Sequence, residues 1–178
     1  MSRKTWIKMM AAFVVSGTVG VALYFRAYPI KLESYIGNES DIQVYDRVDI
    51  GRKVYFLIEK GEALGSVTLK RGWNGRYQLI HLGYGGGNFL DGIVENDGRK
   101  YLLFGGRDIA AQISKIEVQI DGKTYGWYSE EPQAHFLLYT EVDKNVADTH
   151  VNRDKIFFYN EKGTDITEDY CLNGGGIQ

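Results

Sequence analysis

Residues 113–128 constrain the fold of this chain most, because they read as a β-hairpin. Two runs of alternating apolar and polar residues flank Asp121-Gly122, a dipeptide that tolerates the positive φ angles of a two-residue turn. That turn sets Val118 opposite Tyr125 and Ile116 opposite Trp127. The apolar side chains then share one face, so we expect both aromatic residues to be largely buried. A lone hairpin is only marginally stable in water, and this face must therefore pack on further strands.

Other strand-like runs, separated by turn signals, follow one another along the chain from residue 42. Together with the two strands of the hairpin they are 42–48, 53–59, 66–71, 76–82, 89–95, 100–104, 113–120, 123–128, 135–141 and 155–159. This pattern predicts an all-β fold, either an antiparallel β-sandwich or a small barrel. One register stays open: a two-residue loop would pair Leu69 with Ile80, whereas a three-residue loop would pair Leu69 with Leu79.

The charge of the chain is divided unevenly between its two parts. Residues 1–31 contain five basic residues and no acidic one, whereas the remainder holds 16 Lys and Arg against 23 Asp and Glu. Nucleic-acid binding depends on neutralising phosphates with basic side chains. An acidic domain without a basic stripe therefore argues against a nucleic-acid partner.

The N-terminal segment has the pattern of a membrane signal anchor. Residues 1–8 are basic, and the nearly unbroken apolar run 9–25 predicts a single transmembrane helix with its N-terminus in the cytoplasm. Cleavage after Gly20-Val21-Ala22 is the alternative, and it would make the protein secreted. We expect the anchor to be retained, because the apolar run continues past that point. A buried core helix is disfavoured, since the run lacks amphipathic periodicity.

The remaining boundaries follow from composition. Residues 26–41 read as a linker, 42–166 as the extracytoplasmic β-domain and 167–178 as a disordered tail. Cys171, the single cysteine, lies in that tail and excludes an internal disulfide. Its acidic neighbours Glu168 and Asp169 would raise a thiol pKa, so we expect no catalytic role for it.

The glycine-rich stretch 83–88 lies between two predicted strands. A phosphate cradle would need a helix directly after the glycines, and here a strand follows instead. We therefore expect a flexible loop or a bulge. Backbone can approach a ligand closely at such a place, so Tyr84 and Asn88 are candidate binding residues.

The polar loop 143–154 is the second candidate binding segment, with Asp143, Asp148 and His150 as its candidate residues. It offers many oxygen ligands in a short span, as hard cations require. The spacing does not match a calcium-binding helix–loop–helix, since the bidentate Glu and the internal Gly are missing. We therefore expect a solvated recognition loop and no metal.

The sequence shows no catalytic constellation. It has no Gly-x-Ser-x-Gly turn, no His-x-x-x-His pair and no Cys-x-x-Cys pair. His81 and His135 fall within predicted strands, where an imidazole is usually partly buried and hydrogen-bonded. We accordingly assign no catalytic residue and no cofactor.

A set of turn and core residues resembles one family. The matching positions are Leu69, Gly72, Asn74-Gly75, Tyr77, Gly83-Tyr84-Gly85, Lys100-Tyr101, Phe104-Gly105, Asp121-Gly122-Lys123, Tyr125, Phe158-Tyr159-Asn160, Gly163 and Asp165. They are similar to an uncharacterised family of small, membrane-anchored extracytoplasmic β-domain proteins of low-GC Gram-positive bacteria. The resemblance spans most of residues 42–166. It implies the fold and the location, and it brings no catalytic residue.

The sequence thus predicts a membrane-tethered extracytoplasmic binding, sensing or interaction module with an unknown ligand. Its expected partners are the membrane, through the N-terminal helix, and an unknown envelope protein or polymer. Two alternatives stay open, a cell-envelope hydrolase and a structural envelope protein. Two facing carboxylates about 5–9 Å apart in a cleft would favour the hydrolase.

Overall fold

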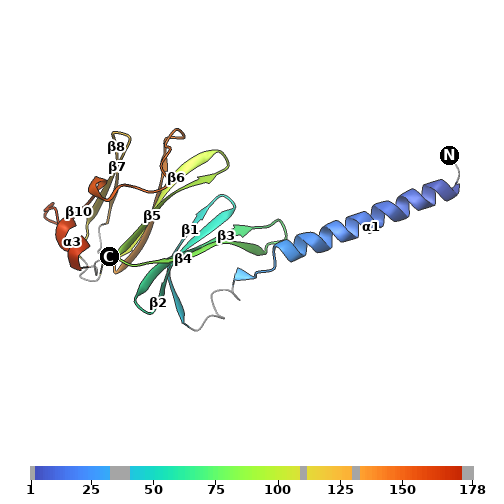
Figure 1. Ribbon diagram of the computed structural model, residues 1–178, viewed down its shortest axis with the longest axis horizontal. Helices are drawn as coiled ribbons and strands as arrows, with labels where there is room; N and C mark the ends of the chain where they lie inside the picture. The colour runs from blue at the N-terminus through green and yellow to red at the C-terminus, as the bar shows by residue number, and fades with distance from the viewer. Residues whose placement is uncertain (1–2, 33–40, 109–111, 130–132, 174–178) are drawn as a thin grey trace.

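The computed structural model describes residues 3–32, 41–108, 112–129 and 133–173. Its elements are labelled in Figure 1, where a long helix leads into a body of strands. They are α1 (Arg3–Ala27), β1 (Ile42–Ile50), β2 (Lys53–Lys60), β3 (Ala63–Arg71), β4 (Tyr77–Gly85), β5 (Phe89–Asn96), β6 (Arg99–Arg107), β7 (Lys115–Ile120), β8 (Lys123–Tyr128), β9 (His135–Val142), the 3₁₀-helix η1 (Arg153–Lys155), β10 (Ile156–Tyr159) and α3 (Thr167–Asn173).

The strands form three antiparallel sheets. The first sheet has the order β1-β2-β3-β4, the second β5-β6-β9 and the third β10-β7-β8. All ten predicted strands are present, and the prediction of an antiparallel all-β fold is confirmed. The small-barrel alternative is wrong for the described chain, because no sheet closes on itself. Three or four strands are too few for closure, since about eight are needed around a packed interior.

The second sheet lies between the other two. On β6, Leu102 and Phe104 are fully buried in a core shared with Val118 and Phe158 of the third sheet. The neighbouring side chain of Leu103 points to the opposite face. There it packs in a smaller cluster that contains Val48 and Tyr55 of the first sheet. Successive side chains of a strand alternate between faces, so one strand can hold two cores together.

The β7–β8 hairpin forms as the sequence predicts. Val118 pairs with Tyr125, Ile116 pairs with Trp127, and Asp121 and Gly122 adopt φ angles of 49° and 75°. Tyr125 and Trp127 are only partly buried, which corrects the expectation that they would be largely buried. The reason is topological: β8 is an edge strand of its sheet, so no further strand covers its outer side.

The open register of the β3–β4 hairpin is settled in favour of the three-residue loop. Leu69 pairs with Leu79, and Gly75 takes a φ angle of 72°. A bulge follows directly, since Thr68 pairs with His81 and leaves Ile80 as the extra residue. The bulge thereby fixes which residue of β4 lies beside Thr68.

The glycine-rich stretch connects the first sheet to the second. Strand β4 continues to Gly85 and β5 begins at Phe89, so only residues 86–88 lie between the strands. The prediction of a flexible loop over 83–88 is therefore wrong for its first half. Pairing with β3 keeps that half extended.

The C-terminal segment corrects a second expectation, that of a disordered tail from residue 167. Residues Thr167–Asn173 form α3, and Tyr170 is buried against the main core. Its hydroxyl lies 3.0 Å from the carbonyl oxygen of Asn88 and 2.8 Å from that of Arg107. Burial raises the pKa of Tyr170, so its hydroxyl stays protonated as a donor. One buried aromatic residue thus orders a segment whose composition is polar.

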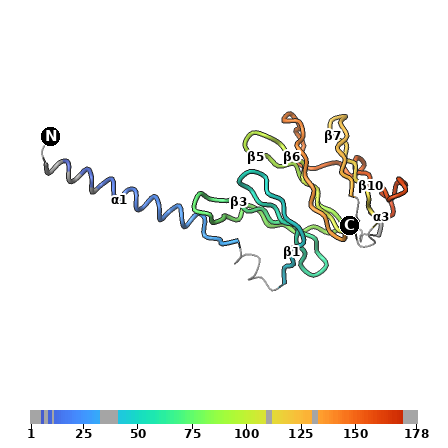
Figure 2. The backbone as a smooth tube through the Cα atoms, turned by 180° about the vertical axis from the view of Figure 1, so that it is seen from behind, coloured from blue at the N-terminus to red at the C-terminus, as the bar shows by residue number. Residues whose placement is uncertain are grey.

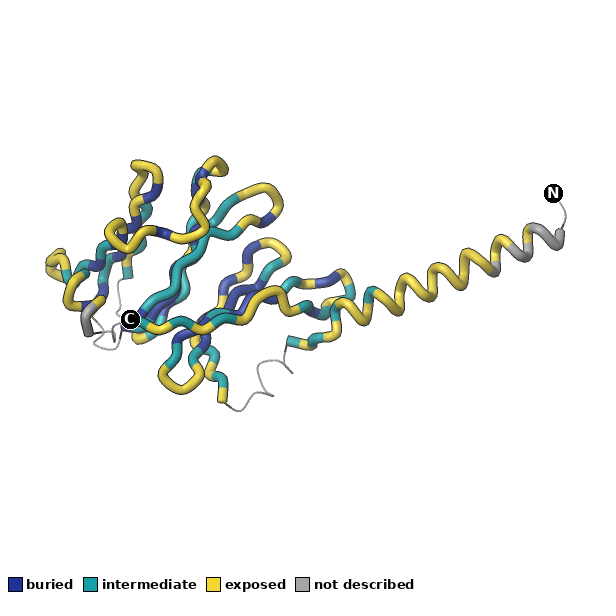
Figure 3. Tube along the Cα trace, in the orientation of Figure 1, coloured by how far each residue is buried: buried dark blue, intermediate teal, exposed yellow. Residues whose placement is uncertain are grey.

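Helix α1 projects from the β-body as a straight rod in both views (Figures 1 and 2). Most of its described side chains are exposed, including Phe13, Val15 and Leu23 (Figure 3). Within the described part of the chain, no helix combines the length and the apolar character needed to cross a membrane. The spanning role of residues 9–25 therefore stays a prediction.

Replacing Gly122 tests the turn of the hairpin. At a φ angle of 75°, a β-branched side chain meets its own backbone, so Gly122→Val should lower the free energy of unfolding by about 1 kcal/mol or more. Gly126→Val in β8 is the matched control, because a Cβ there meets only ordinary contacts of 3.7 Å and beyond. Urea unfolding measures both. Equal stability of the two variants would place the turn elsewhere.

Candidate functional site

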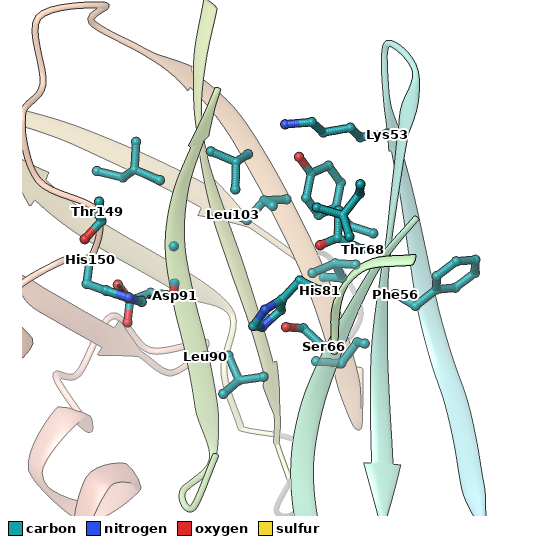
Figure 4. Close-up of a pocket in the computed structure, with 18 residues that line it drawn as sticks. Lys53, Phe56, Ser66, Thr68, His81, Leu90, Asp91, Leu103, Thr149 and His150 are labelled. Carbon is teal, nitrogen blue, oxygen red and sulfur yellow. Dashed lines mark hydrogen bonds and ion pairs between the residues drawn. The ribbon is translucent and has the colours of Figure 1, made fainter. Parts of the chain in front are cut away.

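A cleft of about 340 Å³ separates the first sheet from the second (Figure 4). Strands β2, β3 and β4 form one wall, and β5, β6 and β9 form the other, with a contribution from the loop after β9. The lining residues are Lys53, Tyr55, Phe56, Leu57, Ser66, Thr68, Ile80, His81, Leu90, Asp91, Gly92, Ile93, Val94, Leu103, Gly105, Leu137, Thr149 and His150. The volume is about twice that of a cavity that admits benzene, so a small organic group fits.

A row of polar side chains crosses the first wall of the cleft. Tyr55 pairs with Thr68, and Thr68 pairs with His81, so the three residues lie side by side on β2, β3 and β4. The bulge at Ile80 is what brings His81 into this row. Figure 4 shows His81 and Thr68 on the same side of the sheet, facing β5. The row therefore places the Thr68 and His81 side chains in the lining of the cleft.

The hydroxyl of Tyr55 is the unusual group of the cleft. The residue is only 4% exposed, yet its oxygen atom has no hydrogen-bond partner among the described residues. Burial raises the pKa of Tyr55 to about 12, so the hydroxyl remains a neutral donor at physiological pH. A buried polar group without a partner costs about 1–3 kcal/mol. The oxygen atom itself is buried, so the hydroxyl lies beneath the surface of the cleft.

The charged side chains Asp91 and Lys53, one on each wall of the cleft, are engaged within the protein. The carboxylate of Asp91 accepts a hydrogen bond of 2.6 Å from the backbone N–H of Val151 and lies 3.6 Å from His150 Nδ1. Lys53 Nζ donates to the carbonyl oxygen of Glu95 at 2.7 Å. The Asp91 contacts fix the loop after β9 against β5, and the Lys53 bond joins β2 to β5 across the cleft.

A second polar cluster lies on the same face of β2, where the first and second sheets meet. Glu59 Oε1 lies 3.1 Å from His135 Nε2 and 3.5 Å from Arg107 Nη1, and all three side chains are largely buried. The Tyr45 ring stacks on the His135 ring with centroids 3.6 Å apart. Burial alone would raise the pKa of Glu59. Hydrogen bonds with His135 and Tyr45 and the charges of His135 and Arg107 outweigh burial, so the pKa is lowered.

The cleft contains one carboxylate among its described lining residues. Asp91 is the only carboxylate among the described lining residues of the cleft, so the facing pair expected of an inverting or retaining glycosidase is not present there. No group of three His, Cys, Asp or Glu side chains in the described ranges is arranged to hold a metal ion. The arrangement offers Ser66, Thr68 and His81 as polar groups and can bury apolar groups.

The structure separates the residues that the sequence singled out. Tyr84 is exposed on β4, whereas Asn88 is buried and bonded internally to Arg107 and to the carbonyl of Tyr170. The placement of Asn88 in a free recognition loop is therefore wrong, because α3 packs over it. Asp148 and His150 share a shallow hollow with the β7–β8 turn. Asp143 is paired with Lys123 at 3.2 Å.

Sequence reasoning missed Tyr55 and Thr68 and treated His81 only as a strand residue. Strand β2 is apolar on successive positions from Val54 to Ile58, so its sequence does not reveal which face lines a cleft. In β3, the alternation of Ser66 and Thr68 with Val67 and Leu69 is the signal that could have placed Thr68 on the polar face. His150, in contrast, was a candidate from the sequence and does line the cleft.

Comparison with known proteins finds no matching family model, no similar curated protein and no similar solved structure.

The Glu59 cluster predicts a defined dependence of stability on pH. A carboxylate with a lowered pKa adds stability above its unfolded-state pKa of about 4.3, and the contribution is lost as the pH falls through the folded-state pKa. Glu59→Gln should therefore lower the free energy of unfolding at pH 7, and the difference from the parent should shrink below about pH 4.

Urea unfolding at several pH values measures this difference. Glu141→Gln is the control, since Glu141 forms only an exposed pair with Arg99 at 3.4 Å and should show little change at any pH. A Glu59→Gln deficit that is the same at pH 7 and pH 3 would contradict the role of the ionised carboxylate.

Proposed function

We propose that this chain is a membrane-tethered, extracytoplasmic β-sandwich module that binds a ligand in the cleft between its first two sheets. The observation that carries the proposal is the cleft of about 340 Å³, whose lining includes Tyr55, a residue with a buried hydroxyl that has no partner among the described residues. Interiors normally pair such groups, and departures from this rule are typical of functional sites. The stacking of the second and third sheets around one core supports the sandwich description.

The tether is supported by the exposed apolar side chains within residues 9–25 of α1. Phe13 is 77% exposed, and Val14, Val15 and Val19 are exposed as well, so these side chains have no protein core to enter. A helix that is apolar all round belongs in a hydrophobic environment. The basic residues that precede the apolar run favour a cytoplasmic N-terminus.

Aromatic side chains at the other end of α1 support the same placement. Tyr24 stacks on Tyr28 with ring centroids 4.7 Å apart and lies 4.8 Å from Trp73 of the β3–β4 hairpin. The backbone N–H of Trp73 donates to the Tyr24 hydroxyl at 2.7 Å, while the Trp73 side chain is 68% exposed. Trp and Tyr are enriched at membrane–water interfaces. This cluster would lie at the outer surface of the membrane.

The first test concerns the tether. The protein should remain with the membrane fraction after an alkaline carbonate wash, because the apolar side chains of α1 stabilise insertion. Mass spectrometry of the mature protein should find residues before Ala22 still attached. A mature N-terminus at Leu23 would show that the signal is cleaved and would remove the anchor from the proposal.

The second test concerns the cleft. Tyr55→Phe deletes the unpartnered hydroxyl, so the free energy of unfolding should stay the same or rise by about 1 kcal/mol. Recovery of ligand or partner from solubilised membranes of the native host should instead fall with His81→Ala, because His81 lines the cleft. Tyr101→Phe, in the apolar cluster around Tyr55, is the matched control and should leave recovery unchanged. Unaltered recovery with His81→Ala would contradict ligand binding at this wall of the cleft.

A further inference from the structure

The end of α1 and the turn of the β3–β4 hairpin are packed together (Figures 1 and 2). A Cβ built on Gly72 would lie 2.6 Å from the Tyr24 hydroxyl, so the two segments approach more closely than a side chain at this position permits without a shift. The next residue, Trp73, donates its backbone N–H to the same hydroxyl at 2.7 Å. A backbone bridge between Ile30 and Tyr77 closes the junction. The hairpin is thereby held beside the end of the helix.

Four arginines lie at this junction. The guanidinium of Arg52 donates to the carbonyl oxygen of Arg71 at 3.2 and 3.1 Å, so these two residues lie side by side. The guanidinium of Arg76 lies 5.7 Å from the ring centroid of Phe25, and Arg26 follows Phe25 in the last turn of α1. We call these four residues the arginine cluster: Arg26, Arg52, Arg71 and Arg76.

The arginine cluster has no acidic partner among the described residues. In contrast, Arg47, Arg99 and Arg107 each form an ion pair with a carboxylate. Residues 63–90, which include the whole hairpin, contain three Lys or Arg and no Asp or Glu, although the chain after residue 31 is acidic as a whole. The charge at the junction is therefore opposite to that of the domain, and it is available to an external anion.

Trp73 adds an aromatic ring to the same surface. The residue is 68% exposed, and its ring centroid lies 4.8 Å from that of Tyr24 and 6.3 Å from that of Phe25. Such rings favour the headgroup level of a bilayer, where one end of the ring meets apolar chains and the other meets water. Along the molecule, exposed apolar side chains of α1 are followed by aromatic rings and then by arginines. This order matches a lipid leaflet from its tails to its phosphates.

We propose that the arginine cluster binds the phosphate groups of anionic phospholipids in the leaflet from which α1 emerges, and that this contact holds the β-domain against the membrane. A guanidinium presents its N–H donors in a planar fork that matches two phosphate oxygens. Basic side chains near an anionic membrane surface are also attracted to it within about a Debye length. The inference rests on the proposed function, because α1 must span the bilayer to bring the cluster to the headgroups.

A soluble phosphate compound matches this surface less completely than a lipid does. It would contact the arginines but would leave the exposed ring of Trp73 in water. A phospholipid leaflet offers phosphate to the arginines and an interfacial layer to the ring at the same time. The surface is also continuous with α1, so the proposed membrane span brings it to the lipid without a further movement of the chain.

The experiment uses the full-length chain in vesicles of phosphatidylcholine alone or of an equal mixture of phosphatidylcholine and phosphatidylglycerol. Hydrogen exchange at the amides of residues 71–76 should be slower in the anionic vesicles, on the order of tenfold. High salt should remove this difference in the parent chain, because salt screens the attraction. Arg71→Gln combined with Arg76→Gln should also remove it.

Lys144→Gln combined with Lys162→Gln is the matched control. Both lysines are exposed and lie outside the arginine cluster, and the double change removes the same charge as the arginine variant. The control should keep the difference between the two kinds of vesicle. Loss of the difference in both double variants would show an effect of net charge alone and would overturn the inference. A parent chain whose exchange ignores salt would overturn it without any variant.

Flotation of the vesicles on a density gradient tests the tether separately. A chain that floats with both kinds of vesicle but exchanges equally in both overturns the arginine contact and leaves the tether standing. A chain that floats with neither overturns both. Inorganic phosphate is the last arm: if it slows exchange in phosphatidylcholine vesicles as much as phosphatidylglycerol does, the cluster takes a free anion and the inference is overturned.

Discussion

The structure depends on the burial of β6 from both sides. Leu102 and Phe104 are fully buried toward the third sheet, while Leu103 packs toward the first. Each face of one strand therefore contributes to a different core, and three small sheets that would be marginal alone are held as one body. Burial of large apolar side chains contributes about 1.5–3 kcal/mol each, so the inter-sheet contacts of β6 outweigh any single polar contact in the domain.

The cleft follows from how the first sheet attaches to β6 and its neighbours. The first sheet packs on the second through Val48, Ile50 and Tyr55, and the polar cluster around Glu59 joins the same two sheets. The glycine-rich connection carries the chain from β4 to β5, so both strands become edges of their sheets. The β3–β4 bulge then brings His81 beside Thr68. The cleft thus arises from sheet edges and an inter-sheet space.

Polar groups in the domain serve two different purposes. Asn88, Arg107 and Tyr170 bond to one another across distant parts of the chain, and they tie α3 and β6 to the start of β5. Such fully bonded groups specify how the elements meet. Tyr55 has no such role, because its hydroxyl meets no described partner. The Tyr55 hydroxyl in the wall of the cleft therefore differs from the hydrogen-bonded network of Asn88, Arg107 and Tyr170.

The sequence by itself determined the local features of this protein. Asp121-Gly122 set its turn and the pairing of Val118 with Tyr125, because φ preference and side-chain alternation act over a few residues. All ten strands follow from the same short-range rules. Only the tertiary structure decided which faces became buried: β2 is apolar on both faces, so nothing local marks Tyr55 as lining a cleft. The burial of Asn88 and the folding of residues Thr167–Asn173 into α3 likewise depend on contacts between residues more than 60 positions apart. No local sequence pattern encodes such contacts.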